Sequence, residues 1–320
     1  MKAIPRHTLL AALFGGLSAF GVAAGLLGTS GALHGEAAAW PEPLLPGVPE
    51  VAVTPSDHLV VVKLDHLLTA DNPYSVEWWQ APYMEVEVVP QQMAMPSLAE
   101  ASIETIRVQA LTDGEHIAWR VSWSDSTPDG NVDVSRFSDG VAIEFPLDEG
   151  ALPMMGDEES KVQILYWKAL WQKDIDVGFQ DVQDVHPNFW SDLYWFAEGE
   201  FPYPVPEAFQ NPTALQWFVA HQAGNPMAVF SRRQPVQELV AKGWSTLTNQ
   251  PYSITTAKGV WVRDSWAVVF KRPLKTDDPL DYQFELGGEG QIAFAVWQGS
   301  AQNVGGRKHW SDWVEFEVQE

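Results

Sequence analysis

The chain has 320 residues and no cysteine, and its 42 acidic and 19 basic side chains give a formal charge of −23. The absence of cysteine excludes disulfide bonds, cysteine-ligated iron–sulfur clusters and the C-x-x-C-H attachment of c-type haem. The negative charge disfavours nucleic acid as a partner and favours a basic protein, although solubility or adaptation to salt explains it equally well.

Residues 1–39 are predicted to be an export signal. Lys2 and Arg6 precede an uncharged run at residues 9–27, and the alanines at 37–39 fit a small-residue cleavage site. The uncharged run is also long enough to span a bilayer, so an uncleaved N-terminal anchor is the alternative. No later segment is a candidate membrane span, and the rest of the chain is expected to be exported and periplasmic.

A proline-rich lead-in at residues 40–57 precedes a single predicted domain at residues 58–320. Residues 116–123 alternate clearly between apolar and polar, and Asp113-Gly114 before them predicts a hairpin. Residues 236–242 alone suggest a short helix. Short strands separated by turns predict an all-β fold, a β-sandwich. The other strands are expected at residues 60–64, 103–110, 162–168, 260–262, 266–270, 292–297 and 313–318.

Residues 181–226 break the strand pattern with six prolines and many aromatic side chains. This composition is too aromatic for a free linker and predicts a long ordered insertion, packed against the sandwich or against a partner.

The sequence contains none of the common catalytic patterns. It has no G-x-S-x-G, no phosphate-binding glycine loop and no H-E-x-x-H, and its eight histidines are scattered. His58 and His66 come nearest to a pair. The common catalytic templates are therefore missing from the sequence.

One segment has two unusual features. Met154 and Met155 lie in a predicted turn between a proline and a glycine, and Lys168 ends an apolar row on the strand at 162–168. A buried lysine must lose its proton or find a partner. A neutral amine can bind iron, and a thioether is an axial haem ligand. The alternative is a lysine that reaches solvent and a methionine that fills a gap.

Several segments in order resemble the haem-b (gamma) subunits of ethylbenzene dehydrogenase and its relatives. These relatives form the type II group of the DMSO reductase family, with dimethylsulfide dehydrogenase and selenate, chlorate and nitrite oxidoreductases. The resemblance covers roughly residues 100–320. Its segments are residues 113–125, 137–146, 155–156, 166–169, 238–248, 266–274, 292–299 and 306–308.

The resemblance implies a sandwich akin to DOMON and carbohydrate-binding modules that holds one non-covalent haem b between a methionine and a lysine. On this chain the ligands fall on Met155 and Lys168, with Met154 as the close alternative to Met155. Both ligands are neutral, which fits a high reduction potential. The candidate partners of the haem propionates are Arg272, Arg307 and Lys308.

In such complexes a molybdenum subunit catalyses the reaction, an iron–sulfur subunit relays electrons, and the haem exchanges them with a soluble cytochrome or another carrier. The resemblance therefore implies a non-catalytic electron-transfer subunit. This chain departs from the simplest members in its own export segment and in its aromatic insertion.

Three other functions compete with this interpretation. A sugar-binding module would present exposed tryptophans in a row, a stand-alone periplasmic cytochrome b would have no molybdenum partner, and a haem-free relative would use Met155 and Lys168 only for packing. A core role is expected for Trp119, Trp123, Trp167 and Trp297.

Overall fold

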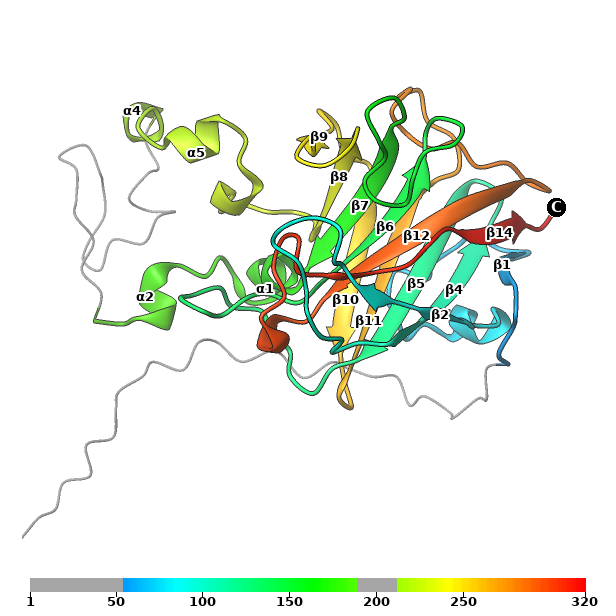
Figure 1. Ribbon diagram of the computed structural model, residues 1–320, viewed down its shortest axis with the longest axis horizontal. Coiled ribbons are helices and arrows are strands. Elements are labelled where there is room, and N and C mark those ends of the chain that lie inside the picture. Colours follow the sequence, from blue (N-terminus) through cyan, green and yellow to red (C-terminus); the bar gives the residue numbers. More distant parts are fainter. Residues whose placement is uncertain (1–53, 189–211) are drawn as a thin grey trace, which may run out of the picture. The chain divides into compact units, whose positions relative to one another are not determined.

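The computed structural model describes residues 54–188 and 212–320 (Figure 1). The predicted export signal, most of the proline-rich lead-in and the middle of the 181–226 segment lie outside these residues. Within the described ranges, no helix combines the length and the apolar character needed to cross a bilayer.

One sheet contains the hairpin predicted at Asp113-Gly114. Its strand order is β10-β11-β5-β4-β1-β14-β12, and β2 pairs with β4. The strands are β1 (Leu59–Lys63), β2 (Met84–Glu87), β4 (Thr105–Thr112), β5 (His116–Ser124), β10 (Thr256–Trp261), β11 (Ser265–Pro273), β12 (Glu289–Trp297) and β14 (Val314–Val318).

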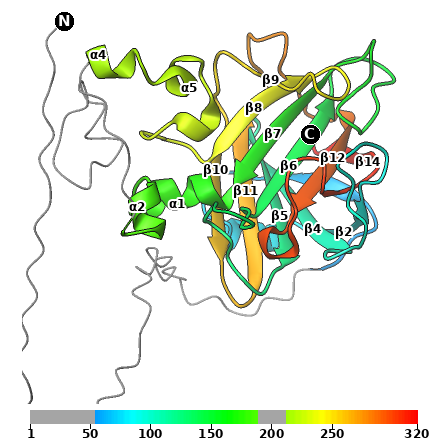
Figure 2. The same cartoon turned by 60° about the vertical axis from the view of Figure 1, so that its left-hand side comes forward.

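The second sheet has the order β12-β6-β7-β8-β9, with β13 beside β12 and β3 beside β13. The strands not yet given are β3 (Val89–Pro90), β6 (Gly140–Pro146), β7 (Val162–Lys168), β8 (Val236–Ala241), β9 (Thr248–Asn249) and β13 (His309–Trp310). Residues 289–292 of β12 pair with β14, and residues 293–297 pair with β6. The strand β12 therefore passes from one sheet into the other (Figure 2).

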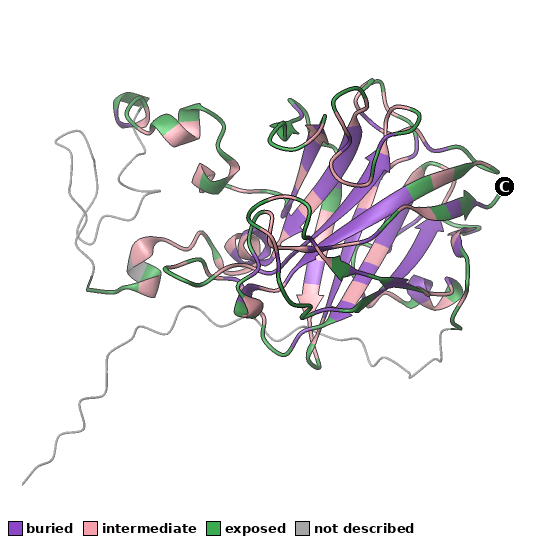
Figure 3. Cartoon of the chain, viewed as in Figure 1, coloured by how far each residue is buried: buried purple, intermediate pink, exposed green. Residues whose placement is uncertain are grey.

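The main core lies between the two sheets and is rich in aromatic side chains. Trp119 of β5 is fully buried, and its ring centroid lies 5.0 Å from that of Phe316 and 5.9 Å from that of Phe145. Trp123 and Trp167 belong to the same cluster, as predicted. Figure 3 shows the burial concentrated in the strands, with exposed residues in the loops. The domain is an all-β sandwich, as the alternating pattern predicted.

The hairpin predicted at Asp113-Gly114 joins β4 to β5. The carboxylate of Asp113 accepts hydrogen bonds from the backbone nitrogens of Glu115 and His116 at 2.8 and 2.6 Å, and Gly114 has φ = 90°. The other predicted strands are all present, and β7 has the predicted bounds. Strong alternation with a turn at its end therefore located these strands from sequence.

The prediction of a helix at residues 236–242 is wrong, because β8 occupies this segment and pairs with β7. The segment has fair helix formers, but Glu238 is buried at 2% exposure and accepts backbone hydrogen bonds from Thr255 and Ile254. Pairing with β7 and these side-chain bonds outweigh a weak local preference.

Short helices occur in the part of the chain that the structure describes around the aromatic insertion. The helix α1 was not predicted; it begins directly after β7, and the Gln172 side chain accepts a hydrogen bond from the Gly259 nitrogen on β10 at 2.8 Å. The helices are α1 (Ala169–Val177), α2 (Val182–Val185), α4 (Pro212–Leu215) and α5 (Val219–Gln222), with 3-10 turns at Val76–Gln80, Pro226–Ala228 and Gly299–Ala301.

Candidate functional site

A cavity of about 370 Å³ lies on the face of β6, β7 and β12 that points away from the main core. Side chains alternate along a strand, so Val141 and Ile143 of β6 enter the core while Ala142 and Glu144 line the cavity. The volume falls within the range of small-molecule and cofactor sites. The remaining lining residues on these strands are Ile164, Tyr166, Lys168, Ala293, Phe294, Ala295 and Trp297.

Three alanines give the floor of this cavity its depth. Ala142, Ala293 and Ala295 project from neighbouring strands, because β6 and β12 are paired directly. Small side chains at these positions leave room that larger residues would fill. The floor can therefore receive a flat apolar group against the sheet.

Loops close the other side of the cavity. Gln91 holds two of them together, because its amide nitrogen donates to the carbonyls of Ala94 at 2.9 Å and Gly306 at 2.8 Å. Trp297 donates from its indole to the Gly305 carbonyl at 2.9 Å. The lining residues from loops and from β8 and β13 are Gln91, Met93, Ala94, Met95, Pro96, Pro153, Met154, Met155, Leu239, Trp244, Ser245, Leu247, Gly305, Gly306, Lys308 and Trp310.

Met155 lies in a tight turn, as predicted. Met155 and Gly156 both have φ = 70°, and a Cβ at Gly156 would meet the Ser160 carbonyl oxygen at 2.3 Å. The Met155 nitrogen donates to the Glu144 carboxylate at 3.2 Å, and its carbonyl accepts from the Gly243 nitrogen at 2.8 Å. The backbone is therefore fixed on both sides, with the Met155 side chain at the cavity.

Lys168 is the last residue of β7 and lines the same cavity as Met154 and Met155. Its Nζ lies 5.0 Å from the ring centroid of Tyr166 and 5.4 Å from that of Trp171. Among the described residues, no carboxylate lies within ion-pair distance of this amine. Burial, and to a lesser degree the charge of Arg232, lower the pKa of Lys168 and favour its neutral form.

A second lysine and a glutamate complete the polar part of the lining. Burial raises the pKa of Glu144 to about 7 against the attraction of Lys308, and burial lowers the pKa of Lys308. Lys308 Nζ also lies 5.4 Å from the Trp297 ring centroid. Lys308 therefore lies at the cavity wall with Glu144 as its acidic neighbour among the described residues, and that carboxyl is partly protonated near neutral pH.

The structure does not bring Arg272 or Arg307 to this cavity. Arg272 points between the two sheets, where its guanidinium donates to Gln163 at 2.7 Å and lies 3.5 Å from Asp281. Arg307 lies over the Phe137 ring, 5.6 Å from the centroid. Both positions are outside the lining, so the structure gives no support to their predicted role as propionate partners.

Sequence reasoning missed Glu144 and, apart from Met154, Met155 and Lys308, the residues that the loops contribute. Glu144 had a detectable signal, because it is a charged residue inside the apolar strand 141–145. Trp297 was predicted as core, but it lines the cavity and packs in a separate cluster on the outer face of the sheet. Met93 and Trp244 gave no local signal for their positions at the cavity.

Glu144 makes stability depend on pH. Its folded-state pKa lies above its ordinary value of 4.5, so the stability that the protonated carboxyl contributes is present below pH 4.5 and is lost as pH rises through about 7. In the haem-free protein, Glu144→Gln should gain roughly 1–3 kcal/mol in free energy of unfolding relative to wild type between pH 4.5 and pH 8.

Urea unfolding at several pH values measures this difference, with Glu158→Gln at an exposed position as the control. A difference between Glu144→Gln and wild type that is the same at both ends of the pH range would contradict the raised pKa.

The comparisons with known proteins agree on one group. The family model described as Ethylbenzene dehydrogenase matches residues 75–309. A protein named as a respiratory nitrate reductase heme subunit from Haloferax mediterranei is 25% identical over 261 residues, 80% of this chain and 72% of that protein. Chlorate reductase subunit gamma from Ideonella dechloratans is 23% identical over 246 residues, 75% of each chain.

Two further similarities are more limited. Dimethylsulfide dehydrogenase subunit gamma from Rhodovulum sulfidophilum is 34% identical over 125 residues, 36% of this chain and 47% of that protein. Among solved structures, a family 9 carbohydrate-binding module from Caldicellulosiruptor kristjanssonii in complex with glucose aligns with a TM-score of 0.34 at 8% identity, covering 82% of this chain and 95% of that chain.

The fold and the cavity define a class of protein, a β-sandwich with a cavity on the outer face of one sheet. The family model extends over most of the described residues, from the 3-10 turn that precedes β2 to the first residue of β13. The chain belongs to the ethylbenzene dehydrogenase family, in the group of the gamma and heme subunits of oxidoreductases.

Proposed function

We propose that this chain is a non-catalytic electron-transfer subunit that holds one non-covalent haem b, with Met155 and Lys168 as the axial ligands. Met154 is the alternative to Met155, because it lines the same cavity. The observation that carries the proposal is that Met155 and Lys168, from a loop and from the end of β7, line one cavity of cofactor size. Relatives that are named as heme or gamma subunits support the same function.

The residues present fit a haem. An axial lysine must be neutral, and the burial of Lys168 without an acidic partner among the described residues favours the neutral amine. The alanine floor and the aromatic rings of Tyr166 and Trp297 suit the apolar face of a porphyrin. When bound, the haem would supply one-electron redox chemistry.

Two protein ligands also explain why the chain would not be catalytic. With Met155 and Lys168 on the iron, no coordination position remains for a substrate, which suits electron transfer. Lys308 lines the cavity together with these ligands, and we assign its amine to a propionate. Arg272 and Arg307 are not assigned.

Relatives that are named as subunits of oxidoreductases support the proposal that this chain has protein partners. The proposed partners are a molybdenum catalytic subunit and an iron–sulfur subunit, with a soluble cytochrome or another carrier as the external partner. The proposed location is the periplasm, which rests on the export signal predicted at residues 1–39.

A sugar-binding module is the second candidate, but the described tryptophans fit it less well. Such a module needs an exposed aromatic platform, and Trp244, at 50% exposure, is the one half-exposed tryptophan at the cavity. Trp297 is 7% exposed. Sugar binding also gives no reason for a half-buried Lys168 without an acidic neighbour among the described residues.

The test is an optical spectrum of the full chain, oxidised and dithionite-reduced, after expression in a haem-replete periplasm. The expected result is a low-spin b-type spectrum with a pyridine haemochrome value near one haem per chain. A folded protein that contains no haem would contradict the proposal, and sugar binding would then be measured.

A further inference from the structure

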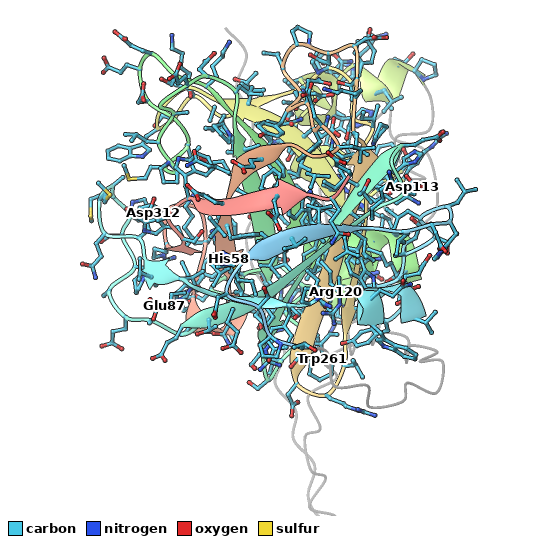
Figure 4. All side chains as sticks on the ribbon, turned by 90° about the vertical axis from the view of Figure 1, so that its right-hand side faces the viewer. His58, Glu87, Asp113, Arg120, Trp261 and Asp312 are labelled. Carbon is cyan, nitrogen blue, oxygen red and sulfur yellow. The ribbon has the colours of Figure 1, made fainter. Side chains whose placement is uncertain are left out.

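Three carboxylates meet at the end of the sandwich where β5 ends and β6 begins. Asp125 directly follows β5, Asp139 directly precedes β6, and Asp129 lies in the connecting loop. Each offers an oxygen, and these oxygens all lie within 4.8 Å of one another. Trp261, at the end of β10, donates from its indole to the Asp125 carbonyl at 2.8 Å. The label of Trp261 in Figure 4 therefore marks the end of the strands where the cluster lies, and Asp113 lies away from it.

Asp139 is held rigidly at the centre of this cluster. It is 0% exposed; its Oδ1 accepts from the Gly299 nitrogen at 2.8 Å, and its Oδ2 accepts from the Asp129 nitrogen at 2.6 Å and the Trp266 indole at 2.9 Å. The Gly299 bond connects the cluster to the end of β12. The carboxylates therefore lie where both sheets are tied together.

Asp125 has an oxygen that these bonds do not satisfy. The residue is 2% exposed, and its Oδ1 accepts from the Thr127 nitrogen at 3.1 Å, but its buried Oδ2 has no hydrogen-bond partner. The buried Oε1 of Gln298, whose amide nitrogen lies 3.4 Å from Asp125 Oδ1, also has none. Buried oxygens without donors are costly, and they are ready ligands for a cation.

The cluster also lacks a compensating positive charge. Within the described ranges, no lysine or arginine lies within ion-pair distance of Asp125, Asp129 or Asp139. Either protons or a bound cation must therefore neutralise these carboxylates.

We propose that Asp125, Asp129 and Asp139 bind one divalent cation of calcium size, which fastens the end of β5 to the start of β6. The three carboxylate oxygens lie within 4.8 Å of one another, so one ion with ligands at about 2.3–2.6 Å, as Ca²⁺ has, could reach all three. Asp125 Oδ2 is the first ligand, and the Asp129 and Asp139 carboxylates would each add one oxygen.

Terbium luminescence tests this site directly, because Tb³⁺ replaces Ca²⁺ and the Trp266 indole that touches Asp139 can sensitise its emission. Titration of the EDTA-treated full chain with Tb³⁺ should give saturable sensitised emission that Ca²⁺ displaces. In Asp129→Asn and in Asp125→Asn the affinity should fall at least ten-fold. Asp312→Asn, an exposed position labelled in Figure 4, should retain the wild-type affinity.

Thermal unfolding gives a second readout that does not depend on haem. Calcium should raise the unfolding midpoint of the wild type and of Asp312→Asn, and should leave that of Asp129→Asn unchanged. If Asp129→Asn does not fold, Asp125→Asn serves in both measurements. Any of three results would overturn the proposal: emission that does not saturate, equal Tb³⁺ affinity in the three variants, or a wild-type unfolding midpoint that does not depend on calcium. The buried carboxylates would then be neutralised by a shared proton.

Discussion

Lys168→Ala is expected to turn the low-spin b-type spectrum high-spin or to abolish haem binding. Alanine removes the amine that would occupy one axial position, and no other lysine lies on the same strand face beside Tyr166. The readouts are the oxidised and reduced spectra and the haem content per folded chain. Met155→Ala should have the same effect from the other axial position.

Matched variants separate ligation from packing. Lys168→Arg keeps a long basic side chain near the rings of Tyr166 and Trp171, but a guanidinium stays protonated and cannot bind iron. It should therefore resemble Lys168→Ala in its spectrum. Lys242→Ala, at an exposed position, should match the wild type. A wild-type spectrum in Lys168→Arg would contradict ligation by the lysine.

The two methionines require their own comparison. Met154 and Met155 both line the cavity, but the Glu144 carboxylate accepts a hydrogen bond from Met155 and fixes the backbone there. The axial assignment expects Met154→Ala to keep the low-spin spectrum and Met155→Ala to lose it. The reverse result would move the ligand to Met154, and Met227→Ala controls for loss of a methionine elsewhere.

The sequence was most informative where alternation and turns coincide. The strand at 162–168 was predicted with its true bounds, and the alternation placed Lys168 on the face that the structure shows at the cavity. The alternation along β11 also indicates where the Arg272 side chain points, and the motif resemblance did not take this into account. Val268 and Phe270 are core residues on the same face of β11, so Arg272 two positions further points between the sheets.

The rest of the site depends on contacts between distant segments. Gln91 and Gly306 are hydrogen-bonded across more than 200 residues, and this bond helps to form the roof of the cavity. Neither segment carries a local pattern that predicts the other. The strand β8 could not be predicted from local sequence for the same reason. Its residues favour a helix, but pairing with β7 makes the segment a strand.

Trp119→Ala is expected to have the largest effect on stability. Trp119 is 0% exposed on β5, and its ring packs against Phe145, Phe284 and Phe316. Truncation of such a side chain removes buried area and leaves a cavity, at a cost of about 3–5 kcal/mol. For a domain of this size the unfolding midpoint should fall by roughly 10 °C. Urea unfolding and calorimetry on the same samples measure both quantities.

Trp119→Phe should lose less, since it keeps an aromatic ring and removes an indole nitrogen that has no hydrogen-bond partner in the described structure. Tyr252→Ala, at 79% exposure, should be close to neutral. Trp119 lies between the sheets and Lys168 lies at the cavity on the outer face. The two substitutions should therefore have different effects on stability and on the haem spectrum. The folded fraction of Trp119→Ala should keep a low-spin spectrum, whereas Lys168→Ala should change the spectrum with a smaller loss of stability. A Trp119→Ala protein that is as stable as the wild type would contradict the packing of the core.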